Sequence, residues 1–569
     1  MTDLAGTEGS GAGAAHSRWA EELASCHEGD DPRGRAASFD ARAPASYRDQ
    51  TSPAEAALDL SELEALAAAG TGVAGATAPD GADRAAPAGA DRAGDAFGGR
   101  HRLLVRPSRD DECTFRIRRY GESGIELTQF LPVLESFGLV VVESVPHKIG
   151  PGARDGPHAH IDDVGVRIDA PDGREALRFA PAIHGPRLVA ALEAVARGDT
   201  EVDSLNRLVT VAGLDWRQVT VLRAYLRYWR QGGTAFGATA LADPLVAFPD
   251  VARSLVGYFE ARFDPGSGAA TPDRPDRERE RCLAGLDLVP QLEQDQVLRG
   301  FLSLIDATLR TNYFQRDGSG GHRPVLVLKL DSRLVPELPN PRPQVEAFVH
   351  GPAMEGIHLR AGMISRGGLR WSERPADFRT EVLDLAFAQV KKNAIIVPTG
   401  AKGGFVCRGG GRRPTPARPG PDLVRAAYEA FVRALLDITD NVVAGEAVTP
   451  AGVVAHDGPD PYLVVAADKG TATFSDLANA VSEEYGFWLG DAFASGGSRG
   501  YDHKAMGITA RGAWVAVRRH FHQLGMDVQT DPIRVVGVGD MSGDVFGNGM
   551  LCSEAILLIA AVDHRHVFL

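Results

Sequence analysis

Lysine is scarce in this chain of 569 residues, although the sequence contains 61 basic side chains. Only seven of these are lysine, and the other 54 are arginine. Five of the seven lie between residues 366 and 543: Lys391, Lys392, Lys402, Lys469 and Lys504. An amine can release its proton in a suitable environment, whereas a guanidinium group stays charged. The bias therefore favours proton-transfer chemistry in this stretch, with chance clustering of a small number of lysines as the alternative.

Cysteine is also rare, and the five present are Cys26, Cys113, Cys282, Cys407 and Cys552. Their irregular spacing suits neither a zinc site nor a disulfide framework, so we expect no bound metal and a cytoplasmic location. No apolar run approaches the ~18 residues of a membrane-spanning helix. The first ten residues lack the basic and apolar segments of a secretory signal. The net charge of −14 argues against a nucleic-acid partner.

The remaining composition, with 44% apolar and 24% charged residues, is that of an ordinary soluble protein. The length favours several domains, and the patterns along the chain predict a multidomain α/β protein. The expected regions are a flexible, linker-like segment at 1–100, a small α/β domain at 101–200, a helical region at 201–320, a further α/β domain at 321–530, and a β-α-β segment at 531–569.

Local patterns predict individual elements within the first two regions. Residues 61–69 favour one short helix, with Ser61 as its N-cap, in an otherwise flexible segment. Apolar runs at 103–105 and 140–142 predict strands, and the segment 127–137 between them predicts a helix. This second region is therefore expected to be a small α/β unit with a structural or regulatory role.

A glycine-rich segment around Lys402 is the first candidate for a functional site. An amphipathic helix is expected at 377–392, followed by a buried strand at 395–397 that ends at Pro398. The residues 399–404 then predict a turn in which glycine lets a ligand approach the backbone closely. Lys402 is therefore a candidate catalytic amine, and an ordinary surface turn is the alternative interpretation.

Asp468 is the second candidate, because it follows a strand expected at 462–466. An aspartate between a strand and a helix is most often a helix cap. A carboxylate that shares a pocket with the Lys402 amine would instead suit proton transfer. Spacing alone leaves both interpretations open.

The end of the chain carries the pattern of a dinucleotide-binding turn. A strand expected at 533–536 leads into G-V-G-D-M-S-G, which is G-x-G-x-x-S, and a second strand is expected at 556–562. The glycines permit a tight turn and close approach of a pyrophosphate, and an acidic residue after the second strand favours NAD over NADP. The expected NAD contacts are Gly537, Gly539, Asp540, Ser542, Gly543 and Asp563.

Several long motifs resemble one protein family. They include R-G-G-L-R-W-S-E-R, K-N-A-I-I-V-P-T-G-A-K-G-G-F, A-D-K-G-T-A-T-F-S-D and G-V-G-D-M-S-G-D-V-F-G-N-G-M. From about residue 345 to the end, the chain closely resembles the large-subunit, NAD-specific glutamate dehydrogenases of bacteria. The resemblance implies oxidative deamination of L-glutamate to 2-oxoglutarate and ammonia, with NAD as the cofactor. It also implies a homo-oligomer, in which residues 321–530 are the α/β substrate-binding catalytic domain and residues 531–569 are the incomplete start of a Rossmann-type dinucleotide-binding domain.

The resemblance also implies roles for individual residues. Lys402 matches the lysine that activates water for attack on the iminium intermediate, and Asp468 matches the aspartate that moves protons to and from the amino nitrogen. The remaining expected substrate contacts are Lys392 or its neighbour Lys391, Arg366 for a carboxylate, and Thr509 near the nicotinamide. Arg366 stands where smaller glutamate dehydrogenases have lysine, and its guanidinium could still bind a carboxylate in a bidentate manner.

Two alternatives accompany this interpretation. A dehydrogenase for leucine or phenylalanine would need an apolar side-chain pocket, whereas Arg366, Lys391 and Lys392 suit a second carboxylate better. The family implies a longer enzyme, so we expect this chain to be a truncated form of it. A catalytically inactive, regulatory remnant is then the other alternative, although Lys402 and Asp468 are retained.

Overall fold

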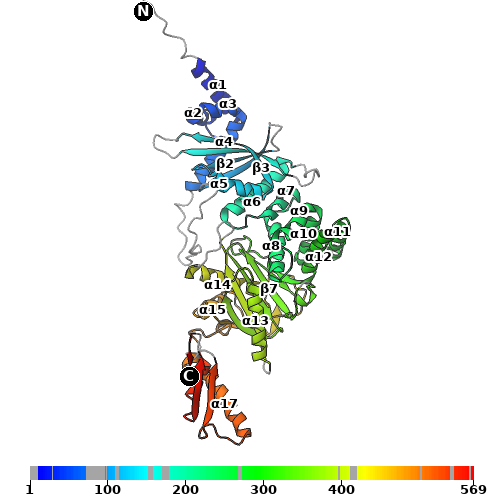
Figure 1. Ribbon diagram of the computed structural model, residues 1–569. Helices are drawn as coiled ribbons and strands as arrows, with labels where there is room; N and C mark the ends of the chain where they lie inside the picture. Colours follow the sequence, from blue (N-terminus) through cyan, green and yellow to red (C-terminus); the bar gives the residue numbers. More distant parts are fainter. Residues whose placement is uncertain are drawn as a thin grey trace, which may run out of the picture. The chain divides into compact units, whose positions relative to one another are not determined.

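The computed structural model of the chain is shown in Figure 1. The chain forms two compact units, Met1–Leu463 and Val464–Leu569. No helix in the described part of the chain is long and apolar enough to cross a membrane. The structure describes residues 11–27, 30–71, 97, 99–108, 115–150, 158–169, 179–266, 272–336, 338–394, 397–409, 419–499, 503–538, 544–562 and 565–569.

Helices occupy most of the described N-terminal segment, so the prediction of a flexible linker is wrong there. Large side chains such as Leu23, Phe39 and Tyr47 are fully buried among these helices. They are few, but they gather in one core, which is why composition alone underestimated the order of this segment. The helices are α1 (Gly11–Cys26), α2 (Pro32–Arg42), α3 (Ala45–Gln50) and α4 (Pro53–Thr71).

Helix α4 begins earlier than the sequence pattern predicted, and Ser61 is not its N-cap. Ser61 lies inside the helix and donates a hydrogen bond to the Ala57 carbonyl at 2.9 Å. The start of the helix is instead marked by Ser52, whose backbone N–H and hydroxyl both donate to the Glu55 carboxylate. The sequence Ser-Pro-Ala-Glu is a capping box with proline at the first helical position, so the local sequence itself marks this helix start.

A four-stranded antiparallel sheet follows, in the strand order β1-β2-β4-β3. The strands expected at 103–105 and 140–142 and the helix expected at 127–137 are confirmed, and two further strands complete the sheet. Alternate residues face opposite sides: Phe115 and Ile117 join the core of α5 and α6, whereas Tyr120 joins the core of α1–α4. The elements are β1 (His101–Pro107), β2 (Phe115–Gly121), α5 (Leu127–Ser136), β3 (Leu139–Ile149), β4 (Ala159–Ile168) and α6 (Pro181–Arg197).

The next region is helical, as its apolar spacing predicted. Helix α8 begins at a capping box in which Asp215 and Gln218 each accept a hydrogen bond from the other's backbone N–H. Its buried aromatic residues, Tyr225, Tyr228 and Trp229, belong to the main core of the unit. The elements are η2 (Ser204–Asn206), α7 (Arg207–Val211), α8 (Trp216–Gln231), α9 (Ala238–Ala247), α10 (Pro249–Phe263), α11 (Arg274–Leu286) and α12 (Leu292–Ala307).

The largest sheet of the first unit has the order β9-β10-β8-β7-β6-β5. Strand β10 is paired on both sides, antiparallel to β8 and parallel to β9. The elements are β5 (Thr308–Thr311), β6 (Leu326–Leu330), η3 (Ser332–Leu334), β7 (Val345–Gly351), β8 (Met354–Arg360), β9 (Ser365–Trp371), α13 (Phe378–Lys392), β10 (Thr399–Cys407), α14 (Pro421–Asp437), β11 (Asn441–Val443) and β12 (Glu446–Val448).

Helices α13 and α14 cover opposite faces of this sheet. A side chain at Gly404 would meet Val382 of α13, whereas a side chain at Gly403 would lie against Phe431 of α14. Consecutive strand residues point to opposite faces, so these two glycines identify which residues of β10 face each helix. The even-numbered residues of β10 face α13.

The second unit contains two parallel strand pairs. Strand β13 pairs with β14, and β15 pairs with β16 with helix α18 between them in sequence, which is the β-α-β arrangement predicted for 533–562. Strand β17 adds to β16 in the antiparallel sense. The elements are β13 (Val464–Ala467), α15 (Ser475–Glu484), η4 (Gly490–Ala492), β14 (Ala494–Ser495), α16 (His503–Met506), α17 (Ile508–Gln523), β15 (Ile533–Val538), α18 (Asp544–Met550), β16 (Ile556–Val562) and β17 (Val567–Phe568).

Candidate functional site

Lys402 lies in the middle of strand β10 and not in a turn, so the turn predicted for 399–404 is wrong. In the antiparallel pairing with β8, Lys402 lies opposite Leu359. Its side chain is 9% exposed, and the strand around it is buried. Of the strand expected at 395–397, residues 395 and 396 lie outside the described residues, and Val397 is exposed and belongs to no strand.

The glycines of this segment serve close packing and not a turn. A Cβ at Gly400 would lie 2.4 Å from the backbone nitrogen of Val390, and a Cβ at Gly404 would lie 2.3 Å from a Val382 methyl group. On the neighbouring strand, a Cβ at Gly367 would lie 1.6 Å from the Ala401 carbonyl oxygen. The absence of side chains therefore lets α13 and β9 approach β10 closely. Lys402, which has the parity of Gly400 and Gly404, lies on the α13 face within this tight packing.

Three basic residues expected to bind a carboxylate lie around the start of β10. Arg366 pairs with Gly400 in the parallel register between β9 and β10. The last two residues of α13, Lys391 and Lys392, directly follow Val390, whose backbone adjoins Gly400. All three side chains are exposed. The fold thus gathers them at one end of the strand that carries Lys402.

The remaining described candidates lie in the second unit. Asp468 directly follows strand β13 and is half-buried, and its backbone exchanges hydrogen bonds with Thr471. Helix α15 begins only at Ser475, with Phe474 at the N-cap position, so the interpretation of Asp468 as the cap of this helix is wrong. Thr509 is exposed in the first turn of α17.

The dinucleotide-binding turn is described at one of its expected residues. Gly537 is buried in β15, and a Cβ there would lie 1.8 Å from the Phe546 ring of α18. Glycine at this position therefore allows α18 to pack closely on β15. The other expected NAD contacts lie outside the described residues: Gly539, Asp540, Ser542, Gly543 and Asp563.

Comparison with known protein families shows the family to which this chain belongs. A family model for the catalytic domain of bacterial NAD-glutamate dehydrogenase matches residues 281–569, just over half of the chain. The chain belongs to this glutamate dehydrogenase family. Two further matches precede the catalytic domain: helical motif 3 of glutamate dehydrogenase at 200–265, and the ACT3 domain of glutamate dehydrogenase at 102–178.

Curated members of the family are similar over most of the chain. The NAD-specific glutamate dehydrogenase of Pseudomonas aeruginosa is 48% identical over 463 residues, which are 79% of this chain and 28% of the relative. That of Mycobacterium tuberculosis is 50% identical over 480 residues, which are 82% of this chain and 29% of the relative. The chain thus spans less than a third of the length of these glutamate dehydrogenases.

A buried ion-pair network, which the sequence did not reveal, braces the sheet of the glutamate dehydrogenase catalytic domain. Asp460 binds Arg360 of β8 through two hydrogen bonds of 2.6 and 2.9 Å, and it accepts one of 2.7 Å from Lys329 of β6. Arg310 of β5 likewise binds Asp440 through two hydrogen bonds. These partners are separated by 100 to 131 residues, and nothing in one sequence connects them.

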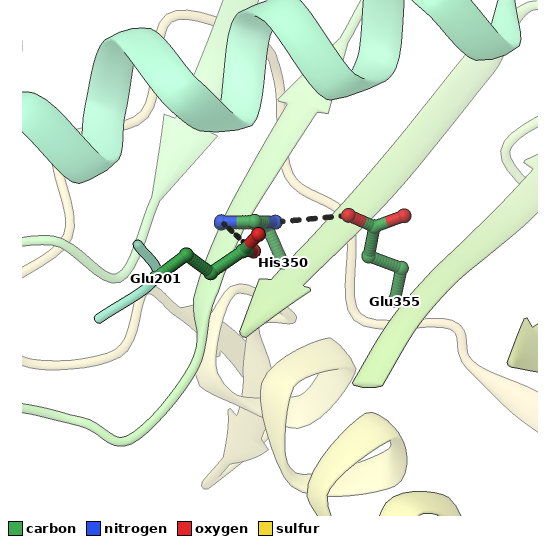
Figure 2. A group of neighbouring side chains, drawn as sticks. All are labelled: Glu201, His350 and Glu355. Atoms are coloured by element: carbon green, nitrogen blue, oxygen red, sulfur yellow. Dashed lines mark hydrogen bonds and ion pairs between the residues drawn. The ribbon is translucent and has the colours of Figure 1, made fainter. Parts of the chain in front are cut away.

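A second buried cluster joins Glu201, His350 and Glu355 (Figure 2). His350 Nδ1 lies 3.3 Å from Glu355 Oε1, and His350 Nε2 lies 3.7 Å from Glu201 Oε1. Arg408, the residue after β10, donates to both carboxylates, and Arg227 of α8 donates to Glu201 at 2.6 Å. The two guanidinium groups already balance the two carboxylates. The cluster is therefore an ionic link from the helical region to the end of β10.

The charges in this cluster determine the protonation of Glu355. Burial alone would raise the pKa of Glu355, but the hydrogen bond from His350 and the charges of Arg408 and Arg227 outweigh it and lower the pKa to about 2. A folded-state pKa below the ordinary value means that the ionised carboxylate stabilises the fold above about pH 4.5. That contribution is lost as the pH falls through the folded-state value.

We expect Glu355→Gln to lower the free energy of unfolding by about 3 kcal/mol at pH 7. The difference from the wild type should shrink between pH 4.5 and pH 2, because protonation then removes the same charge from the wild type. Urea denaturation at several pH values measures this difference. Glu429→Gln, in a half-exposed pair with Arg433, should change the stability by less than about 1 kcal/mol. A Glu355→Gln effect that is equal at every pH would contradict the assignment.

Proposed function

We propose that this chain carries out the NAD-dependent oxidative deamination of L-glutamate to 2-oxoglutarate and ammonia. The observation that carries the proposal is Lys402, a buried amine on a rigid, glycine-packed strand, with three basic residues at the start of that strand. Rigid packing holds a catalytic group in one geometry, as acid–base catalysis requires. Membership of the glutamate dehydrogenase family supports the same chemistry.

The basic residues favour glutamate over an amino acid with an apolar side chain. Glutamate has two carboxylates, and cationic side chains bind carboxylates through charge-assisted hydrogen bonds. Arg366, Lys391 and Lys392 supply three exposed cations beside the start of β10. Leucine or phenylalanine would leave the cations intended for a side-chain carboxylate without a partner, at a cost in binding free energy.

NAD suits the residues of the β15–α18–β16 segment. When bound, NAD supplies an acceptor for the hydride from the α-carbon of the substrate. Phe546 leaves no room for a side chain at Gly537. Gly537 would form the turn that holds the cofactor's pyrophosphate, together with Gly539, Ser542 and Gly543. Asp563 would bind the ribose hydroxyls, and Thr509 would lie near the nicotinamide.

Two side chains of this protein would carry out the proton transfers of the reaction. Lys402, as the free amine, would take a proton from the water that attacks the substrate iminium carbon. Asp468 would carry protons to and from the amino nitrogen as ammonia leaves. Arg366 and one or both of Lys391 and Lys392 would hold the substrate carboxylates during these steps. A homo-oligomeric state and a cytoplasmic location stay predictions.

The direct test is NADH formation by the purified chain with L-glutamate and NAD, followed by absorbance at the nicotinamide band. NADP in place of NAD and L-leucine in place of glutamate are the controls. Turnover with glutamate and NAD alone would support both specificities. Absence of turnover together with absence of 2-oxoglutarate binding would favour the inactive remnant instead.

A further inference from the structure

The connection between α13 and β10 joins the end of one catalytic element to the start of the other. Lys391 and Lys392 end α13, and β10 begins at Thr399 with Lys402 three residues later. The distance between the carboxylate-binding lysines and the Lys402 amine therefore depends on how this connection is held. We infer that Asn393 is a positioning residue that sets this distance for the substrate, an inference that rests on the proposed function.

Asn393 is 8% exposed and fastens both sides of the connection with its side-chain amide. Its Nδ2 donates to the carbonyl oxygens of Pro398 at 3.2 Å and Thr399 at 3.3 Å. Its Oδ1 accepts a hydrogen bond of 3.0 Å from Gln389 Nε2, one turn earlier in α13. Carbonyl oxygens only accept hydrogen bonds, so the NH2 group must face Pro398 and Thr399. One side chain thus binds the end of the helix to the start of the strand.

The backbone of Asn393 completes this attachment. As the C-cap of α13, its N–H donates to the Gln389 carbonyl at 3.0 Å, so the residue is held to the helix by both its backbone and its side chain. On the strand side, Thr399 N–H donates to Ile364 next to β9, which fixes the first residue of β10 in the sheet. The amide of Asn393 is therefore fixed at both ends.

The position of this amide explains why it should act on substrate binding. It lies directly after Lys392 and contacts the backbone at Thr399, the residue before Gly400, which pairs with Arg366. Loss of its two donated bonds would let the end of α13 shift relative to Arg366 and Lys402. A substrate with two carboxylates needs these cations at fixed separations, and a displacement of about 1 Å can cost up to about 100-fold.

Asn393→Asp is the sharpest test, because aspartate has the same size but cannot donate to Pro398 and Thr399. We expect it to raise the dissociation constant of 2-oxoglutarate, measured by isothermal titration calorimetry, by about 10-fold or more. In steady-state assays, the KM for glutamate should rise while the KM for NAD stays unchanged. Gln389→Ala removes only the bond to Oδ1, so it should weaken 2-oxoglutarate binding by a smaller factor.

Asn206→Asp is a matched control in the helical region. Asn206 is 3% exposed, and its Nδ2 donates to the Glu201 carbonyl at 2.9 Å and to Ser136 Oγ at 3.1 Å. The same substitution there also removes two donated hydrogen bonds, and it should leave 2-oxoglutarate binding unchanged. A purely structural role for Asn393 predicts that the two variants behave alike.

The possible outcomes separate this inference from the proposed function. If the wild-type chain does not bind 2-oxoglutarate, the proposed function fails and this inference fails with it. If the wild type binds and Asn393→Asp binds equally well, the inference is overturned while the proposed function stands. If Asn393→Asp does not fold, Gln389→Ala decides: unchanged 2-oxoglutarate binding in this variant overturns the inference, and weakened binding supports it.

Discussion

Replacement of Lys402 with alanine is expected to remove nearly all glutamate-dependent NADH formation. General acid–base catalysis contributes about 10²–10⁴-fold, so kcat should fall by at least about 100-fold. The folded structure should persist, because the substitution removes one buried side chain from a strand that is hydrogen-bonded on both sides. NAD affinity, measured by titration, should stay close to that of the wild type.

Lys402→Arg distinguishes a proton-transfer role from a charge-only role. Arginine keeps the positive charge at this position, but its guanidinium group does not release its proton. We therefore expect kcat to fall as far in Lys402→Arg as in Lys402→Ala. Substantial activity in the arginine variant would show that Lys402 supplies only a charge.

Lys148→Ala is the control for loss of a lysine as such. Lys148 is exposed on β3, outside the catalytic domain, so its replacement should leave both kcat and KM unchanged. Retained activity in Lys402→Ala with an unchanged control would remove Lys402 from the mechanism. The basic residues at the start of β10 would then be the remaining basis for the proposed function.

Replacement of Asp460 with alanine is expected to cause the largest loss of stability. Asp460 is 3% exposed and binds Arg360 and Lys329, which are themselves buried. Burial alone would raise the pKa of Asp460, but the adjacent Arg360 and Lys329 lower it, so the carboxylate is charged. Removing one partner of a buried ion pair leaves an uncompensated charge and costs about 3–5 kcal/mol.

The loss in Asp460→Ala can be measured as a decrease in the urea midpoint and in the free energy of unfolding. Glu429→Ala is the matched control, because Glu429 and Arg433 form a half-exposed pair within α14. Exposed pairs of this kind contribute less than about 1 kcal/mol, so the control should unfold almost as the wild type does. An equal effect of the two substitutions would mean that the Asp460 network does not brace the sheet.

The periodicity of apolar residues was sufficient to predict those helices and strands whose residues follow a local pattern. Helices α5 and α13 and strands β15 and β16 were expected within a few residues of their ends, because apolar spacing and the glycine or proline residues that end an element are local signals. The candidate residues of the proposed site were also chosen from local motifs, because the order of the residues is itself the signal. The family assignment followed from these motifs and agrees with the comparison.

Tertiary packing determined the conformation of the segment around Lys402. Local propensity predicted a turn at 399–404, because the three glycines of this segment favour a turn in isolation. The fold uses Gly400 and Gly404 of this segment, together with Gly367 of β9, to bring α13 and β9 close against β10. Composition likewise failed at 11–71, where a few well-placed apolar residues share one core.

The sequence by itself determined which side chains are candidates for the proposed chemistry: Lys402, Asp468 and the basic residues Arg366, Lys391 and Lys392. Arg366 precedes α13 in the sequence, whereas Lys391 and Lys392 end this helix. Only the tertiary structure decided that Arg366 pairs with Gly400 in the register between β9 and β10, which brings it beside the two lysines. Strand register and ion pairs depend on residues up to a hundred or more positions apart, such as Arg360 and Asp460. Local patterns carry no information about such partners, because the closure of long loops is determined by the packing of the whole unit.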